Sequence, residues 1–283
     1  MKSDFQLKLG TFLWKLLQYT SLVLFGFIAV FPVVSCVITA FKPEAEYKST
    51  TVMSLPENWL YFGNFVTAWQ KSNMGRAFLN STIIVIFVVF GSVMIGSMLA
   101  YVLSRFKFRG NGTIRNLFLY AALIPGIAMQ IPLYKMMNTI HFNNSIPGYI
   151  ILMMGTDVIS IYIFIQFFEN ISTSLDESAI MDGASYFTIF FKILFPLLRP
   201  AVVTVMILKG VGVYNEYYSA NLYLQKSELR TVALALYTFV GPMKSQYNLI
   251  CAGVLITLTP ALIIFILFQK QIYNGLTTGA VKG

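Results

Sequence analysis

Histidine, cysteine and charged residues are all scarce in this sequence. Its 283 residues include one histidine and two cysteines, and 11% of them are charged. The two cysteines each lie inside an apolar run, so a disulfide framework is not expected. With His141 as the single histidine, a metal cluster would have to consist of carboxylates alone, and we expect no metal site.

Hydrophobic residues, by contrast, make up 57% of the chain, and its mean hydropathy is +0.71. A helix needs about 20 apolar residues to cross a hydrocarbon layer of about 30 Å. Several runs meet this requirement, and the first is too long for a signal peptide. We therefore predict an all-α membrane protein that forms a single transmembrane domain over residues 1–283. The predicted spans are residues 12–40, 77–103, 114–137, 146–168, 201–222 and 248–272.

Basic residues predict the orientation of these spans. The net charge is +9, but the charges are scattered and form no face shared with aromatic residues, so a nucleic-acid partner is not expected. The short loop 104–115 has four basic residues and no acid, which is the strongest positive-inside signal in the chain. It predicts that this loop, both termini and the loop 169–200 face the cytoplasm. The outer loops also contain basic residues, so the orientation rests mainly on this one loop. Its basic residues are Arg105, Lys107, Arg109 and Arg115.

The loop 169–200, between the fourth and fifth predicted spans, is unusually polar. It holds Asp176, Glu177 and Asp182, three of the eleven acids. Lipid offers no hydrogen bonds, so water or protein must satisfy these groups. We predict a short helix that begins with a capping box from Ser174 to Glu177. A bend or a close backbone approach at Gly183 should follow.

The same residues resemble a known signature. Importer-type ABC permeases have a cytoplasmic loop of the form E-A-A, three residues, G, nine residues, I, one residue, L-P. Two positions depart from it, since Ser178 replaces the second residue of the triplet and Phe195 replaces the leucine. In that family the loop is the coupling helix that sits in a groove of the ATPase subunit; otherwise it would be an ordinary amphipathic connector. The matching positions are Glu177, Ala179, Gly183, Ile193 and Pro196.

Further motifs resemble the permease subunits of carbohydrate-uptake ABC importers, of the type that includes the maltose permease. In this order and spacing they are specific. They imply a type I ABC importer permease with six transmembrane helices and a coupling loop at residues 169–200. The motifs are Thr39–Lys42, Asn80–Ser81, Ser104–Gly110, Ile131–Tyr134, Asp182–Ala184 and Gly275–Gly283. The residues implied to couple to the ATPase are Glu177, Ala179, Asp182, Gly183, Ala184 and Pro196. The tail 273–283 is implied to reach the ATPase subunits through Gly279, Lys282 and Gly283.

The resemblance also implies a function. The chain would be the permease subunit of an ATP-driven, binding-protein-dependent importer of sugars or oligosaccharides in a bacterial cell membrane, coupling ATPase motion to alternating access. Its implied partners are a second homologous permease, two ATPase subunits, an extracellular solute-binding protein, the sugar and membrane lipid. ATP and magnesium would bind to the ATPase subunits, because this chain has no G-x-x-x-x-G-K-[ST] loop and binds no cofactor.

Three alternative interpretations compete with this one. The first is an ABC permease for a solute other than a sugar. The second is a secondary transporter, but such proteins commonly have internal repeats, and no doubled half is found here. The third is a membrane-embedded enzyme, which would need a catalytic constellation at membrane depth. His141 lies in a predicted outer loop and Asp157 has no second aspartate in a span, so we expect no enzyme.

Three ionisable residues fall within predicted spans: Asp157, Lys209 and Glu216. Each costs roughly 2.5–3.5 kcal/mol at a helix centre, so it should face a cavity or a partner. Asp157 lies about 16 Å from the outer end of its span and Lys209 about 13 Å from the inner side of the next. These depths nearly coincide, so we predict a salt bridge. It would either lock the two spans together or contact sugar hydroxyl groups.

Polar and aromatic residues follow Lys209 along the chain. Tyr214, Asn215 and Glu216 lie near the predicted outer end of the fifth span. Aromatic faces and hydrogen-bonding groups suit a sugar, although Tyr217 and Tyr218 also fit an aromatic belt at the membrane interface. We predict that Asp157, Lys209 and these three residues line the translocation path.

Overall fold

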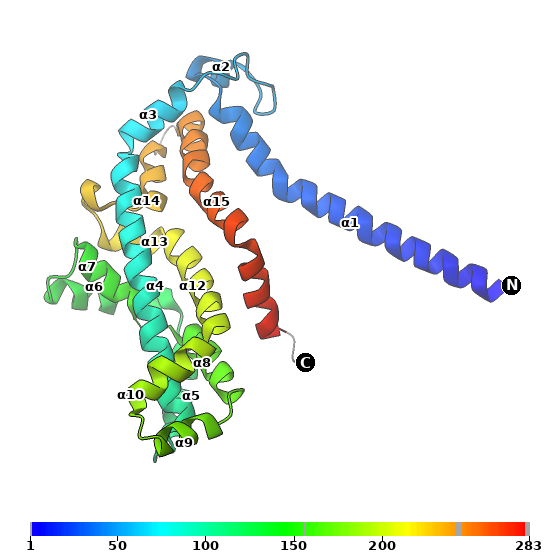
Figure 1. Cartoon of the computed structure of the whole chain (residues 1–283). Coiled ribbons are helices and arrows are strands. Elements are labelled where there is room, and N and C mark those ends of the chain that lie inside the picture. Colours follow the sequence, from blue (N-terminus) through cyan, green and yellow to red (C-terminus); the bar gives the residue numbers. More distant parts are fainter. Residues whose placement is uncertain (1, 156, 242–244, 281–283) are drawn as a thin grey trace. The chain divides into compact units, whose positions relative to one another are not determined.

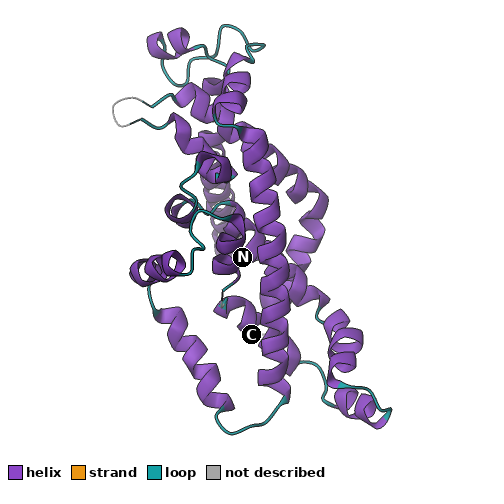
Figure 2. Ribbon diagram, turned by 90° about the vertical axis from the view of Figure 1, so that its left-hand side faces the viewer, coloured by secondary structure: helices purple, strands orange, loops and turns teal. Residues whose placement is uncertain are grey.

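The computed structural model describes residues 2–155, 157–241 and 245–280 (Figure 1). Helices joined by loops make up the described residues, which contain no strand (Figure 2). The chain divides into two compact units, described here one at a time. The first unit comprises Met1–Ser72 with Leu236–Pro260, and the second comprises Asn73–Ala235 with Ala261–Gly283.

The first unit is built around the end of one long helix. Helix α1 (Lys2–Ala40) contains the membrane-length stretch Phe12–Ala40, with the bounds that the sequence predicts. Ala40 packs in an apolar cluster with residues of the helices α3 and α15, among them Ala68 and Ala252. The other helices of this unit are α2 (Glu44–Ser49), α3 (Gly63–Lys71), η4 (Tyr237–Phe239) and the first part of α15 (Tyr247–Ala280).

Two buried side chains satisfy the polar groups after α1. The Asn64 amide donates to the backbone carbonyls of Ala40 at 2.8 Å and Lys42 at 2.7 Å, and its oxygen accepts from Asn248 at 3.0 Å. The carbonyls at a helix end have no partner within the helix, so Asn64 takes their place as a donor. The ammonium group of the fully buried Lys42 donates to Thr51 O and to the Ser54 hydroxyl, each at 2.8 Å. The loop after α1 is therefore held from inside.

The second unit is organised around α4 (Met74–Arg105), a membrane-length helix that matches the predicted second span. Helices α7, α8 and α12 pack against it. Small residues allow this contact: a Cβ atom at Gly96 would lie 3.5 Å from the Phe164 ring, and a Cβ atom at Gly91 would clash with Met154. Such small-residue faces permit close helix packing where no water drives association. The packing helices are α7 (Ile146–Met154), α8 (Val158–Glu169) and α12 (Arg199–Tyr214).

Two prolines in the third predicted span, Pro125 and Pro132, predict that both break it, but the helix is broken at only one of them. Helix α5 (Asn111–Leu123) and the segment Gly126–Thr139 meet at 95° across Pro125. Pro132 lies instead in the first turn of α6 (Gln130–Thr139). A proline in a first turn removes an N–H that has no intrahelical acceptor, so this second predicted break is wrong.

The fourth and fifth spans differ from the prediction of continuous helices. The fourth is divided into α7 and α8, which are bent by 48°. The fifth ends at Tyr214 rather than at Leu222, and a separate helix follows. In both places a carboxylate accepts from the first turn of the new helix, that of Asp157 at α8 and that of Glu216 at the helix after α12. The following elements are α13 (Tyr218–Tyr223), η3 (Ser227–Leu229) and α14 (Val232–Leu236).

The membrane-length part of the sixth helix, Tyr247–Lys270, agrees with the predicted span 248–272, and α15 itself continues beyond it to Ala280. Among the described residues, three helices are long and apolar enough to cross a membrane, and three bent pairs each pass the same test together. Up to six spans result if each bent pair is one span. Bending thus hides half of the spans from a search for long straight helices.

Candidate functional site

The loop that resembles the coupling signature forms a short helix with a defined end. Helix α9 (Ser174–Met181) stops where Gly183 adopts a φ of +79°. The Gly183 N–H donates to Ile180 O at 2.9 Å, and the Ala184 N–H donates to Ala179 O at 2.9 Å. This pair of bonds is a Schellman motif, in which a residue with positive φ satisfies the last carbonyls of a helix.

The spacing between Ala179 and Gly183 in the coupling signature therefore has a local structural reason. Ala179 is buried, and Ala184 packs against the same apolar cluster, as is common for this helix end. A Cβ atom at Gly183 would meet nothing within 4 Å, so the chain itself requires glycine for its φ and not for space. Of the two predicted roles for Gly183, the bend is the one seen in this chain.

The predicted capping box is wrong. Ser174 is already inside the helix, and the side chain of the N-cap residue, Thr173, makes no capping hydrogen bond. Instead the Ser172 hydroxyl accepts from the Ser174 N–H at 3.3 Å. Glu177 is consequently not used to close its own helix, and its side chain is exposed.

The outer surface of α9 is partly apolar. Met181 is 87% exposed and Phe187, shortly after the helix, is 69% exposed. Glu177 and Asp182 are exposed on the same short segment. Apolar side chains with a few acids, on a segment that follows the last turn of α8, give a surface suited to contact another protein.

A buried charge pair holds α9 from its inner side. Arg105, the last residue of α4, places its Nε atom 3.1 Å from Oδ2 of Asp176, and both side chains are largely buried. The contact is ionic and its angles do not make a hydrogen bond. The same guanidinium donates to Ile171 O at 2.9 Å and lies 5.9 Å from the centre of the Phe168 ring. Figure 1 shows α9 beyond the C-terminal end of α4, where these contacts form.

Sequence reasoning missed this role of Arg105, which served only as part of the positive-inside signal. Burial raises the pKa of the Asp176 carboxyl above its ordinary value, and the positive charge of Arg105 offsets part of that effect. An arginine at the end of one span and an acid before the coupling signature were both visible in the sequence. Nothing in the sequence signals that Arg105 and Asp176, which are 71 residues apart, lie in contact.

The predicted salt bridge between the fourth and fifth spans is confirmed. Nζ of Lys209 lies 3.4 Å from Oδ2 of Asp157, and both side chains are about one-fifth exposed. Asp157 is not in mid-helix, however. It is the N-cap of α8, where Oδ1 accepts from the Ser160 N–H at 3.4 Å and Oδ2 from its hydroxyl at 2.8 Å. One carboxylate therefore caps a helix at the break and neutralises a lysine.

The three other predicted path residues lie at the end of α12, and two of them bond locally. The exposed Asn215 donates to Val211 O at 3.0 Å. Glu216 accepts from the Ser219 N–H at 2.7 Å and so caps the next helix. Tyr214 is half-buried as the last residue of α12. Asn215 lies six residues beyond Lys209, which is about 9 Å along a helix axis.

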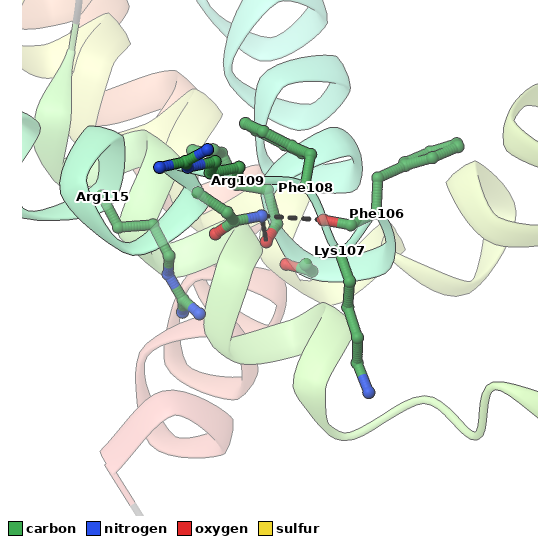
Figure 3. A pocket seen from close by; sticks show the side chains of 8 residues that line it. Phe106, Lys107, Phe108, Arg109 and Arg115 are labelled. Carbon is green, nitrogen blue, oxygen red and sulfur yellow. Dashed lines mark hydrogen bonds between the residues drawn. The ribbon is translucent and has the colours of Figure 1, made fainter.

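The basic loop between α4 and α5 borders a pocket of about 520 Å³. The Asn111 amide shapes the loop by donating to Leu103 O at 3.0 Å and Phe106 O at 2.8 Å. In Figure 3 the charged ends of Lys107 and Arg115 point in different directions, so they do not converge on one anion. Arg115 is paired with Glu169 at 2.6 Å.

Two predictions concern metals and the tail. Among the residues that the structure describes, no group of three or more histidine, cysteine, aspartate or glutamate side chains could hold a metal ion.

In the tail, Gly279 lies in the last turn of α15, whereas Lys282 and Gly283 lie outside the described residues.

Apolar helices, six of them forming three bent pairs, with the short polar helix α9 between the fourth and fifth spans, define a polytopic helical membrane protein. The family model described as "Binding-protein-dependent transport system inner membrane component" matches residues 9–274, so the chain belongs to this family. It is a multi-pass membrane protein and a permease component of such a system.

Individual relatives cover almost the whole chain. A probable starch degradation products transport system permease protein of Thermoanaerobacterium thermosulfurigenes is 31% identical over 94% of this chain and 96% of its own length. The melibiose/raffinose/stachyose import permease protein of Bacillus subtilis is 30% identical over 87% of this chain and 88% of its own length.

A solved structure has the same fold. A chain of a bacterial ABC transporter involved in the import of the acidic polysaccharide alginate aligns with a TM-score of 0.81 at 20% identity. The alignment covers 91% of this chain and 96% of that one. The type I permease fold that the sequence predicts is therefore confirmed.

Proposed function

We propose that this chain is the permease subunit of an ABC importer of sugars or oligosaccharides. The similar proteins are named for starch degradation products, for melibiose, raffinose and stachyose, and for arabinooligosaccharides. Each of these solutes is a carbohydrate larger than one sugar ring or a mixture of such molecules. An oligosaccharide is accordingly the substrate class that the relatives support best.

The complex contains a second homologous permease, two ATPase subunits and an extracellular solute-binding protein. ATP and magnesium bind to the ATPase subunits. The loop 104–115, both termini and α9 face the cytoplasm, where the ATPases are. The exposed acids and apolar residues of α9 support this arrangement, because an exposed apolar surface with polar residues around it is typical of a protein-binding site.

The observation that carries the proposal is the attachment of α9 to α4 through Arg105 and Asp176. A displacement of α9 by an ATPase is transmitted directly to α4. The Arg105 guanidinium at the end of α4 contacts both the Asp176 carboxylate in α9 and the Ile171 carbonyl just before α9. Helix α4 in turn packs along α8 and α12. Motion of the coupling helix therefore changes the helix bundle that alternates between inward and outward openings.

Within this proposal, the coupling residues have separate roles. Glu177 and Asp182 are exposed and meet basic groups of the ATPase groove, whereas Ala179, Gly183 and Ala184 make the helix end. Pro196 lies in α11 (Phe195–Leu197), directly after a π-helical stretch, η2 (Ile189–Leu194), in a segment that bends by 76° into α12. Proline favours such a bend, since it lacks an N–H.

Asp157 and Lys209, near the middle of the membrane, and Tyr214, Asn215 and Glu216, nearer its outer side, border the translocation path. Asp157 lies at the break between α7 and α8, and irregular backbone at membrane depth is tolerated where it lines a cavity. The C-terminal segment of the chain approaches the ATPase subunits through Gly279, Lys282 and Gly283.

Charge reversal at Glu177 tests the proposal. The complex with Glu177→Lys should fold and bind the loaded solute-binding protein, yet take up no sugar, because the exposed acid no longer meets its basic partner. Asp4→Lys serves as a charge-matched control, because Asp4 is an acid near the N-terminus, far in the sequence from Glu177. Uptake at the wild-type rate in the Glu177→Lys complex, measured with radiolabelled oligosaccharides, would refute the coupling role.

A panel of solutes tests the substrate class separately. The cognate solute-binding protein should gain thermal stability with oligosaccharides and not with amino acids or peptides, since only bound ligand shifts its unfolding. If only a non-carbohydrate stabilises it, the substrate class is wrong while the coupling mechanism stands.

A further inference from the structure

The two cysteines of this chain touch each other. They are 215 residues apart in the sequence, and their Sγ atoms are 3.3 Å apart in the first unit. Cys36 belongs to α1 and Cys251 to α15, and both are free thiols. A chain with only two cysteines has brought both to one point.

Their surroundings differ in a way that matters for reactivity. Cys251 is 9% exposed, in the apolar cluster that includes Ala252, whereas Cys36 is half-buried and packs against that cluster. Cys36 lies four residues before the end of α1 at Ala40, and Cys251 four residues after the start of α15. Each is therefore about 6 Å from its helix end. A small neutral reagent reaches the Cys36 sulfur first.

We propose that Cys36 and Cys251 form an oxidative modification site, at which a small peroxide closes a disulfide between α1 and α15. A disulfide has a sulfur–sulfur length of about 2.05 Å, so the two sulfurs need to approach by about 1.2 Å. Both side chains have a rotatable χ1 angle that can supply this movement. Both residues belong to one compact unit, so no rearrangement between units is needed.

The reaction balances with hydrogen peroxide as the oxidant. The Cys36 sulfur attacks one peroxide oxygen, the O–O bond breaks, and a sulfenic acid and water form. The Cys251 sulfur then attacks the Cys36 sulfur, the S–O bond breaks, and the hydroxyl leaves as a second water molecule with the remaining thiol proton. The two sulfurs together lose two electrons, which the peroxide gains. Cys36 is thus the attacking residue and Cys251 the resolving residue.

The disulfide has a structural consequence. Most of α1 is exposed along its length, and the described contacts of its apolar side chains are concentrated near Ala40. A covalent bond to α15 would close a loop of more than 200 residues, and long closed loops restrict the unfolded chain most. The oxidised protein should therefore unfold at a temperature several degrees higher than the reduced protein, and a dithiol should reverse the shift.

The experiment uses the assembled complex in detergent, treated with hydrogen peroxide, quenched, denatured and alkylated with a maleimide. We expect this chain to lose both maleimide labels and the mass of two hydrogen atoms, and to regain both labels after reduction. The single variants Cys36→Ser and Cys251→Ser are matched controls, since each keeps one thiol and should gain no intramolecular bond. The Cys251→Ser variant should accumulate oxidised Cys36, because no resolving thiol is present.

Three results would overturn the proposal. One is full labelling of both thiols in the peroxide-treated chain. Another is a gain of one or more oxygen atoms at Cys36 of the unaltered chain, with Cys251 still free. The last is a disulfide between two protein chains, visible as a heavier band on a non-reducing gel. None of these results depends on the proposed transport function.

Discussion

Arg105 and Asp176 form a buried ion pair, with Nε and Oδ2 3.1 Å apart, that joins the end of α4 to α9, the proposed coupling helix. The two residues lie in different loops of the sequence. Arg105 belongs to the basic loop that indicates orientation, and Asp176 belongs to the acidic loop that resembles the coupling signature. Their contact ties these two loops to each other.

Loss of Arg105 should therefore destabilise the protein. Arg105→Met leaves the Asp176 carboxylate buried without a counter-ion, which costs roughly 3–5 kcal/mol when a buried pair is broken. The double variant Arg105→Met with Asp176→Asn should recover part of that loss, because no charge is then buried alone. Thermal unfolding of the complex and sugar uptake provide the measurements. Equal loss in the single and double variants would contradict the pairing.

The same carboxyl predicts a pH dependence. Burial raises the pKa of Asp176 in the folded protein, so the folded state binds its proton more tightly than the unfolded state. Its contribution to stability is fully present below the unfolded pKa and is lost as pH rises through the folded pKa. Compared with Asp176→Asn, the unaltered protein should lose stability as pH increases from about 4. Unfolding curves of both proteins from acidic to neutral pH measure this, and a constant difference would count against it.

Gly183→Ala should shorten or distort the end of α9. With a φ of +79°, any residue with a Cβ atom is strained there by about 1–2 kcal/mol. Gly112→Ala is the matched control, because Gly112 lies in α5 without a positive φ and its Cβ atom would also meet open space. Alanine in a helix is favoured by up to about 1 kcal/mol over glycine. Unfolding temperatures should thus move in opposite directions, and a drop of equal size in both variants would disprove the conformational explanation.

The pair Asp157 and Lys209 allows a double-mutant cycle. Asp157→Asn and Lys209→Met should each reduce stability, with a coupling of about 1–3 kcal/mol between them, since residues in contact do not act additively. Asn can still cap α8, so this substitution isolates the charge. A coupling near zero would show that the two charges do not stabilise one another.

Uptake kinetics in the same variants separate locking from sugar contact. If the pair only locks α8 to α12, the double variant should regain much of the uptake rate with an unchanged half-saturating concentration. If the pair contacts sugar, that concentration should rise in every variant, including the double one. Either result assigns a role to the pair, and the measurement is uptake against solute concentration.

Half of the spans were predictable with near-correct bounds because their apolar runs are continuous. The second span, for example, was expected at residues 77–103 and forms Met74–Arg105. The breaks were harder. Pro125 indicates one break from its chemistry alone, whereas the end of α12 at Tyr214 depends on Glu216 and its bond to Ser219. Such a cap competes with helix continuation by only about 1 kcal/mol, which no apolar pattern shows.

The amino-acid sequence by itself determined that this chain is a bundle of apolar helices with a polar loop that resembles the coupling signature, because span length and signature spacing are local properties. It also predicted one long-range contact, between Asp157 and Lys209, since two charges in membrane-spanning segments have few alternatives to each other. Only the tertiary structure decided that Arg105 meets Asp176 and that Cys36 meets Cys251. Those contacts follow from how helices pack and bend, and residues far apart in a sequence leave no local trace of their meeting.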